Sequence, residues 1–302
     1  MRDRVKIIVN PVSGKGRALR RAEKVAAALR ALGCEVDLRQ TAQGGDARRL
    51  AGESVGFSAV AATGGDGTVN EVLNGLPIDA SPGAPTLAMI PSGTANVLAK
   101  ELRLPRKTSE LAQLLREGKE SPWDLGVERG SGRRFLLFAS AGYDAHVVHL
   151  FHAARTGPIR MWQYAWWGFK SLLTYDVPRI AVELDGRKVA DDAAWVLVSQ
   201  VASYGGPLVF TGDARPGRGV FEVMIQRGRS RWDVVKILWS AMLTWIFGGR
   251  CGLGGVSYHQ AKRIRLTSAD GKTVPMQVDG DPGGELPADL EIVPGAIRVA
   301  QP

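Results

Sequence analysis

Hydrophobic runs that each end in a glycine-bearing turn recur through the first third of the chain. Val5 to Val9, Phe57 to Ala62 and Thr86 to Ile90 are apolar enough to form buried strands. Each run leads through a polar turn into a segment whose apolar residues have helical spacing. This alternation predicts a parallel sheet covered by helices, as in Rossmann-like α/β domains.

The predicted helices are recognised by apolar stripes and stop signals. The stripe after the first strand consists of Ala22, Val25, Ala26, Leu29 and Leu32. Gly33 follows it and suits the position just beyond a helix end. Further helices are predicted over Val69 to Leu76, Val97 to Leu102 and Thr108 to Lys119. Together these elements predict an α/β domain over residues 1–121.

Beyond Trp123 the pattern changes to short strands, separated by turn signals such as Asp185-Gly186 and Asp270-Gly271. The predicted strands are Arg134 to Ala139, Arg179 to Leu184, Ala193 to Val201, Val220 to Ile225 and Arg263 to Thr267. We therefore expect a second, mostly antiparallel β domain over residues 122–285.

Two tryptophan-bearing segments, Ile159 to Lys170 and Trp232 to Phe247, interrupt this pattern. Neither contains the roughly 20 uninterrupted apolar residues that a membrane-spanning helix needs. Each fits either a helix in a membrane interface, where Trp is favoured, or an ordinary helix packed on the sheet. For the second segment packing is favoured, because a core stripe can be drawn through Val235, Leu238, Trp239, Met242 and Trp245.

Composition fits an enzyme with full hydrophobic cores, since 45% of the 302 residues are hydrophobic. Cys34 and Cys251 lie far apart and match no metal-binding spacing, so we expect free thiols in a reducing cytosol. The first apolar run is too short for a signal peptide. These features predict a cytoplasmic protein.

Basic residues outnumber acidic ones, 39 to 30, which gives a net charge of +9. An anionic membrane surface is the favoured partner, because each Lys or Arg gains about 1 kcal/mol near acidic lipid. A surface that only promotes solubility is the alternative. No nucleic-acid partner is predicted, because the basic residues are scattered and no nucleic-acid motif is present.

Candidate chemistry centres on Gly64-Gly65-Asp66-Gly67-Thr68, between a predicted strand and a predicted helix. Free N–H groups and the positive end of a helix dipole favour a phosphate there. Asp66 suits this position only with Mg²⁺ or a transferring proton beside the phosphate, which indicates a nucleoside triphosphate and its metal. Thr68 and Glu71 have capping-box spacing, so the helix is predicted to begin at Thr68.

The turns at Asn10–Gly16 and Pro91–Asn96 follow the other two strands. The P-loop and the dinucleotide fingerprint do not fit, because Val9 and Asn70 stand where those motifs need Gly. In an open α/β sheet, ligands bind beyond the carboxyl ends of the strands. The three turns together therefore predict a nucleotide site.

The sequence resembles the diacylglycerol kinase catalytic-domain family through three motifs in matching order and spacing. These are N-P-x-S-G at Asn10–Gly14, G-G-D-G-T-x-N-E-V-x-N-G at Gly64–Gly75 and P-x-G-T-x-N at Pro91–Asn96. The resemblance extends over nearly the whole chain. It implies an α/β nucleotide domain, a β-sandwich-like second domain and an active site in the cleft between them. It also implies that residues 286–302 pack back on the first domain.

For function, the resemblance implies an ATP-dependent lipid kinase that phosphorylates the hydroxyl of diacylglycerol or a related lipid. ATP and Mg²⁺ are the implied cofactors. The predicted partners are the lipid, an anionic surface at the inner face of the membrane, and a second copy of the chain in a homodimer. A soluble-substrate kinase resembling NAD kinase, and a non-catalytic lipid- or nucleotide-binding regulator, remain as alternatives.

The resemblance also assigns roles to single residues. Asp66 would hold Mg²⁺ directly or through water, while Asp279 and Asp281 match the family's D-G-E motif at the proton acceptor. An extended segment would let both of these carboxylates face one cleft, with either one as the base. The predicted nucleotide-binding residues are Asn10, Pro11, Ser13, Gly14, Thr41, Gly64, Gly65, Asp66, Gly67, Thr68, Glu71, Gly93, Thr94 and Asn96.

Three positions depart from the family pattern. Asp281 replaces the usual Glu, and Val97 replaces an Asp that often follows the third motif. Arg218 stands where the family has an Asp ligand of a structural Mg²⁺, whereas Asp124 matches the pattern. The structural metal site is therefore incomplete at Arg218, and Asp124 is its remaining candidate ligand.

Overall fold

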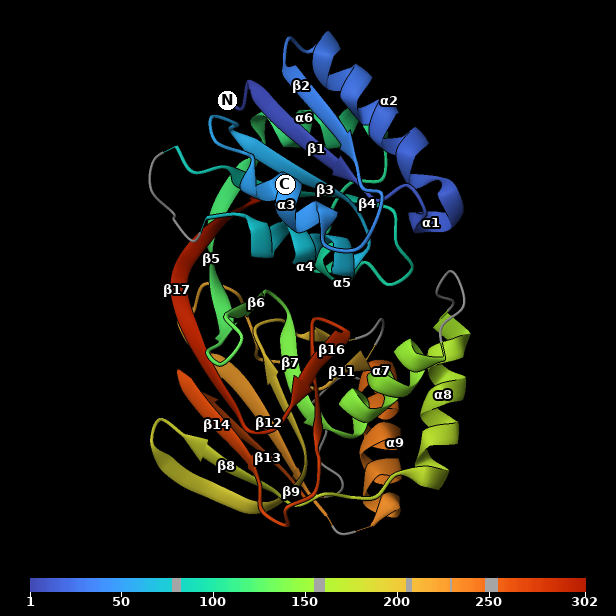
Figure 1. The fold of residues 1–302 in the computed structure, drawn as a ribbon, viewed down its shortest axis with the longest axis vertical. Helices are drawn as coiled ribbons and strands as arrows, with labels where there is room; N and C mark the ends of the chain where they lie inside the picture. Colours follow the sequence, from blue (N-terminus) through green and yellow to red (C-terminus); the bar gives the residue numbers. More distant parts are fainter. Residues whose placement is uncertain (78–82, 155–160, 205–207, 229, 248–254) are drawn as a thin grey trace. The chain divides into compact units, whose positions relative to one another are not determined.

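The computed structural model describes residues 1–77, 83–154, 161–204, 208–228, 230–247 and 255–302. The chain divides into two compact units. The N-terminal unit comprises Met1–Leu125 and Gly295–Pro302, and the C-terminal unit comprises Gly126–Pro294. Strands β5 (Lys119–Glu128) and β17 (Ala288–Gln301) contribute residues to both units, as can be followed in Figure 1.

A parallel sheet in the order β2-β1-β3-β4 forms the centre of the N-terminal unit, and the end of β17 pairs with β4. Every residue of β3 is buried, because both faces of a parallel sheet are covered. The edge strand β2 is largely exposed or half-buried. The elements of this unit are β1 (Arg4–Val9), α1 (Ser13–Gly16), α2 (Ala18–Ala31), β2 (Glu35–Gln40), α3 (Asp46–Gly52), β3 (Ala59–Gly64), α4 (Asp66–Gly75), β4 (Thr86–Pro91), α5 (Val97–Glu101) and α6 (Thr108–Glu117).

The apolar stripe predicted after the first strand is the buried face of α2. Ala22, Val25, Ala26 and Leu29 are buried there, and Gly33 follows the helix end with a φ of 88°. This face packs on α6 and on the sheet, where it joins one hydrophobic cluster. The pattern of apolar positions was therefore sufficient to predict both the helix and its buried side.

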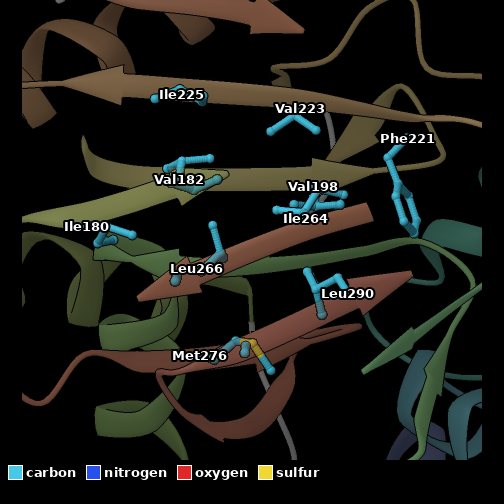
Figure 2. Close-up of a cluster of buried hydrophobic side chains, with 14 of the residues drawn as sticks. Ile180, Val182, Val198, Phe221, Val223, Ile225, Ile264, Leu266, Met276 and Leu290 are labelled. Carbon is cyan, nitrogen blue, oxygen red and sulfur yellow. The ribbon is translucent and has the colours of Figure 1, made fainter. Parts of the chain in front are cut away.

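Antiparallel strands build the C-terminal unit. Its sheet runs β16-β15-β7-β9-β8-β14-β17; β12 pairs with β9 and β13, and β6 pairs with β5. Buried side chains from these strands form one cluster, drawn in Figure 2. The strands are β6 (Arg133–Phe135), β7 (Phe138–Gly142), β8 (Ile180–Leu184), β9 (Arg187–Ser199), β10 (Ser203–Tyr204), β11 (Leu208–Val209), β12 (Phe221–Arg227), β13 (Val256–Ala261), β14 (Arg263–Ser268), β15 (Pro275–Val278) and β16 (Asp281–Glu285).

Four of the five strands predicted here are confirmed with shifted ends, and Asp185-Gly186 is the turn between β8 and β9. The single strand predicted over Arg134 to Ala139 is wrong. The chain leaves the sheet after Phe135 and re-enters it at Phe138, because the backbone N–H groups of residues 136–138 bond to the Asp279 carboxylate. Hydrogen bonds made to a side chain are not available to a strand ladder.

Both tryptophan-bearing segments are helical: α8 (Met161–Thr174) and α9 (Arg231–Phe247) lie in the C-terminal unit with α7 (Tyr143–Ala153). The core stripe predicted along α9 is wrong, because Trp239 is 56% exposed while Val234 and Ile237 are buried. Residues 159–160 and the Trp245 side chain lie outside the described residues. Among the helices that the structure describes, none has the length and apolar character needed to cross a bilayer.

The thiol of Cys34 is free and buried, as predicted, and burial raises its pKa. The prediction for Cys251 falls outside the described residues.

Candidate functional site

The turns after β1, β3 and β4 meet at the carboxyl ends of these strands. The N–H groups of Ser92 and Gly93 both donate to the Gly64 carbonyl oxygen, at 2.9 and 3.0 Å. A Cβ built on Gly93 would lie 2.4 Å from the Gly65 Cα, so this contact requires glycine. A Cβ on Gly14, whose φ is +60°, would lie 2.4 Å from the Ser92 carbonyl oxygen. The structure thus brings the three predicted phosphate turns into direct contact.

Asp66 joins the second turn to the helix that follows the third. Its carboxylate oxygens accept the N–H groups of Val97 and Leu98, at 3.0 and 3.2 Å, at the start of α5. Burial raises the pKa of the Asp66 carboxyl, while these N–H groups and the nearby Lys100 charge oppose the rise. Asp66 therefore fixes the third turn, and only its remaining lone pairs are available to a metal or a water.

Two asparagines close their own turns. Asn96 has a left-handed backbone, with φ 47°, and its side-chain amide exchanges two 2.9 Å hydrogen bonds with the backbone of Gly93. The Asn10 side-chain oxygen accepts the Val12 N–H at 3.3 Å. Both side chains thus shape the turns, and a direct contact of either one with a nucleotide stays a prediction.

The capping box predicted for the second motif does not form. Helix α4 begins at Asp66, two residues before Thr68, and its N-cap residue is Gly65, which has no side chain to cap the helix. Glu71 instead accepts the N–H of Gly45 at 3.0 Å, in the turn after β2. The Thr68 hydroxyl packs on Gly64, where a Cβ would lie 2.3 Å from the hydroxyl oxygen. Glu71 and Thr68 therefore contact neighbouring turns and do not cap the helix.

The other predicted nucleotide-binding residues lie in the same unit. Thr41 directly follows β2, and its N–H donates to the Val9 carbonyl oxygen at 3.0 Å. Thr94 is exposed, whereas Pro11, Ser13 and Gly67 are half-buried. All fourteen predicted residues belong to the N-terminal unit; Gly64 is the last residue of β3, and the others follow β1, β2, β3 or β4 in the sequence.

The donor set fits a Mg²⁺ ion that arrives with a nucleotide. Among the described residues, no group of three or more His, Cys, Asp or Glu side chains is placed to hold a metal alone. Mg²⁺ commonly takes one or two carboxylates and completes its shell with phosphate oxygens and water. Asp66 supplies one carboxylate whose lone pairs are not all used by Val97 and Leu98.

Asp279 and Gly280 form a two-residue turn between β15 and β16, with φ values of 51° and 86°. The extended segment predicted here is wrong, because Val278 pairs directly with Asp281 across a hairpin, and the two carboxylates contact different groups. Asp279 is buried, and its carboxylate accepts three backbone N–H groups at 2.9–3.1 Å. The donors are Leu136, Leu137 and Phe138.

Asp281 lies on β16 with 35% of its side chain exposed. Its oxygens are 3.4 Å from the Nε2 of His152 on α7 and 3.8 Å from a guanidinium nitrogen of Arg133 on β6. Arg133 also donates to the carbonyl oxygens of Pro282 and Val278, which fixes it beside the hairpin. Neither His152 nor Arg133 was predicted, because they come from elements distant in sequence and carry no motif.

Asp124 is buried in the N-terminal unit and accepts the Gly295 N–H at 2.8 Å, which ties β5 to the C-terminal segment. Arg218 belongs to the C-terminal unit and donates to the Asp213 carbonyl oxygen at 3.3 Å. Asp124 thus has a structural role in this fold, and its role as a metal ligand stays a prediction.

Two family models cover almost the whole chain. Residues 4–127 match the diacylglycerol kinase catalytic domain, and residues 138–301 match the YegS C-terminal NAD kinase β sandwich-like domain. The chain belongs to the diacylglycerol kinase catalytic-domain family. This diacylglycerol kinase family member is therefore a lipid kinase, and the family implies ATP as its phosphate donor.

Curated relatives and solved structures agree with this membership. The diacylglycerol kinase of Bacillus subtilis (strain 168) is 27% identical over 303 residues, covering 99% of this chain and 96% of that protein. The diacylglycerol kinase of Staphylococcus saprophyticus is 29% identical over 304 residues, covering 100% and 96%. A crystal structure of a diacylglycerol kinase from Bacillus anthracis str. Sterne has a TM-score of 0.74 at 22% identity, covering 100% of this chain and 97% of that one. The predicted fold class, a Rossmann-like α/β unit followed by a β-sandwich-like unit, is confirmed.

Proposed function

We propose that the protein transfers the γ-phosphate of ATP to the hydroxyl of diacylglycerol or a closely related lipid. The observation that carries this proposal is the contact between three glycine turns at the strand ends of a lipid kinase fold. The acceptor class is taken from the relatives, which are named for diacylglycerol.

The triphosphate would bind at the three turns. Helix α4 is ten residues long, and the N–H groups and positive dipole of its first turn favour an anion. Because Gly65 and Gly93 touch without intervening side chains, phosphate oxygens can approach the backbone there. Lys15 and Arg17 are exposed beside the first turn and can neutralise phosphate charge. Asn10 and Asn96 would keep the turns in shape before ATP arrives.

Mg²⁺, when bound with ATP, neutralises charge on the β- and γ-phosphates. Asp66 would hold the ion through lone pairs that Val97 and Leu98 leave free, directly or through water. The hydrogen bonds to the start of α5 keep the carboxylate oriented, so loss of Asp66 would affect both the metal and the third turn.

Asp281 is the better candidate for the general base. The lipid hydroxyl attacks the γ-phosphorus, its proton passes to the carboxylate, and the bond to the leaving ADP oxygen breaks. Asp281 is partly exposed, and its carboxylate lies beside the side chains of His152 and Arg133. Asp279 is buried and already accepts three N–H groups, so it would position the hairpin and its partner carboxylate.

A soluble-substrate kinase acting on NAD is the second candidate, because the C-terminal unit matches a domain described as NAD kinase β sandwich-like. A phosphorylation assay with labelled ATP separates the two. Diacylglycerol in vesicles and NAD in solution are offered in parallel, and the labelled product is identified. Label in phosphatidic acid supports the proposal, whereas label only in NADP supports the alternative. ATP binding without product from either acceptor would favour the non-catalytic reading.

We expect the enzyme to work peripherally at the inner face of a membrane. Its acceptor resides in a bilayer, and an excess of 39 basic over 30 acidic residues favours an anionic surface. A homodimer also stays a prediction. Sedimentation velocity in the absence of lipid would test the dimer directly.

A further inference from the structure

We propose that helices α8 and α9 of the C-terminal unit form an aromatic and basic face that docks on an anionic lipid bilayer. This face is defined by Trp166, Phe169 and Lys170 on α8 and by Trp232, Lys236 and Trp239 on α9. The proposal rests on the proposed lipid acceptor, because it assigns the surface through which the enzyme would reach that lipid.

On α8 the exposed side chains share one stripe. Trp166 and Phe169 are 57% and 63% exposed, and Lys170 is exposed beside them. Their spacing of three and four residues places them on one side of the helix. The Lys170 ammonium lies 4.9 Å from the centre of the Trp167 ring, so the cation is held next to the aromatic side chains.

On α9 the same arrangement recurs over two turns. Trp232 and Trp239 are 73% and 56% exposed, with exposed Lys236 between them at i+4. The opposite side of the helix is buried through Val234, Ile237 and Ala241. The tryptophans are therefore not core residues left partly uncovered. They lie on the side of α9 opposite its buried residues.

The two helices are linked within the C-terminal unit. The Arg231 side chain at the start of α9 donates to the carbonyl oxygen of Tyr175, just after α8, at 2.9 Å. Helix α8 is also fixed to α7, because the Tyr143 hydroxyl donates to the Gly168 carbonyl oxygen at 2.6 Å. Figure 1 shows α7, α8 and α9 together at one side of the strands of this unit. The two stripes thus belong to one supported group of helices.

The chemistry of this face favours a bilayer interface. Trp has an apolar ring with a polar N–H, and its preferred place is the headgroup region of a membrane. Lys side chains can extend their apolar stems over such a surface and keep the ammonium in the headgroup region. Asp233, the acidic residue of α9, forms an ion pair with Lys236 at 3.0 Å and accepts the Ser230 hydroxyl, so acidic headgroups would compete with Asp233 for Lys236.

The catalysed reaction supplies the reason to prefer lipid over a protein partner. A lipid kinase must meet an acceptor that is insoluble in water, and no described helix of this chain can cross a bilayer. A peripheral face that combines large aromatic side chains with cations meets this need, because apolar insertion and attraction to acidic headgroups add together.

Vesicle flotation tests the proposal, with phosphatidylcholine vesicles prepared with and without phosphatidylglycerol. We expect the full-length enzyme to bind the acidic vesicles preferentially. The variant Trp232→Ala/Trp239→Ala should bind at least about ten-fold more weakly, given the apolar area withdrawn from water by two tryptophans. Lys170→Gln should lose about five-fold in binding, equivalent to about 1 kcal/mol, whereas Lys236→Gln should lose less because Asp233 already pairs with Lys236. Val55→Ala, at a 93% exposed apolar position of the N-terminal unit, is the matched control and should bind like the wild type.

Activity on a short-chain diacylglycerol dissolved without vesicles separates the two proposals. All variants should phosphorylate it like the wild type, because none of these residues touches the reacting groups. Absence of product from the wild type would refute the proposed function, while flotation would still decide the docking face. Unchanged flotation of the tryptophan variant would overturn the docking face, as would equal binding to neutral and acidic vesicles. A shift from dimer to monomer in that variant, with vesicle binding intact, would instead make the face a contact between two copies.

Discussion

The carboxylate of Asp66 accepts the backbone N–H of Val97 at 3.0 Å, so the second glycine turn holds the start of α5 in place. We predict that Asp66→Ala abolishes turnover and weakens binding of Mg·ATP. Fold stability should fall by only about 1 kcal/mol, the usual cost of a lost helix cap. The kcat, a nucleotide titration and a urea titration measure the three effects. Turnover near that of the wild type at saturating Mg²⁺ would remove Asp66 from the mechanism.

The contact between Gly65 and Gly93 gives a second prediction. Gly93→Ala should push the second and third turns apart, because its Cβ would lie 2.4 Å from the Gly65 Cα and 2.9 Å from the Asn96 side-chain oxygen. A displacement of about 1 Å at a reacting site can cost about 100-fold in rate. We expect a loss in kcat/KM for ATP of that order.

Gly44→Ala is the control for this substitution. Gly44 lies in the turn after β2, and a Cβ there would meet nothing within 4 Å. Its kinetic constants should match those of the wild type. If Gly93→Ala also behaves like the wild type, the packing of the three turns does not control nucleotide binding.

The sequence was informative where function depends on local backbone shape. The strand, turn and helix pattern predicted β1, β3 and β4 and the contacts of their turns, because glycines and Asp66 lie within short motifs. The sequence pattern did not predict hydrogen bonds between a side chain and a segment distant in sequence. Glu71 has capping-box spacing from Thr68 but bonds to Gly45, 26 residues away.

The C-terminal unit shows the same limit. Asp279 was predicted in an extended segment, but it forms a hairpin turn and takes up N–H groups that would otherwise continue a strand near Phe138. Its partners are more than 140 residues away in the sequence. Helix α9 was predicted correctly, but its buried side was not. The predicted stripe through Val235 and Trp239 lies about one position away from the buried residues Val234 and Ile237. Tryptophan suits both a core and a membrane interface, so periodicity alone does not decide between them.

Asp144 gives a prediction for pH dependence. This buried carboxylate on α7 accepts hydrogen bonds from Ser140, Tyr204 and Gln277. Burial nevertheless raises the pKa of Asp144 above its ordinary value. The folded state therefore binds the proton more tightly than the unfolded state, in which the pKa is about 3.9. The stabilising effect of the bound proton is complete below that pH and is lost as the pH rises through the folded pKa.

The variant Asp144→Asn has no proton to lose at this position. Relative to Asp144→Asn, the wild type should become less stable as the pH rises from about 3.9 and should then reach a plateau. Urea midpoints measured for both proteins across the acidic range give this difference directly. A difference that does not change with pH, or one that changes in the wild type's favour, would contradict a raised pKa.

The two carboxylates of the β15–β16 hairpin should separate in their effects. Asp281→Asn keeps the size of the side chain and removes its capacity to accept a proton. We expect kcat to fall by about 100- to 10,000-fold, the usual contribution of a general base, with little change in ATP affinity. Asp279→Asn should mainly lower stability, by about 1–3 kcal/mol, because one of three buried N–H groups loses its acceptor. Asp191→Asn, at an exposed surface carboxylate of the same unit, serves as the control. If Asp281→Asn keeps more than about a third of wild-type kcat while Asp279→Asn loses it at unchanged stability, the assignment of the base must be reversed.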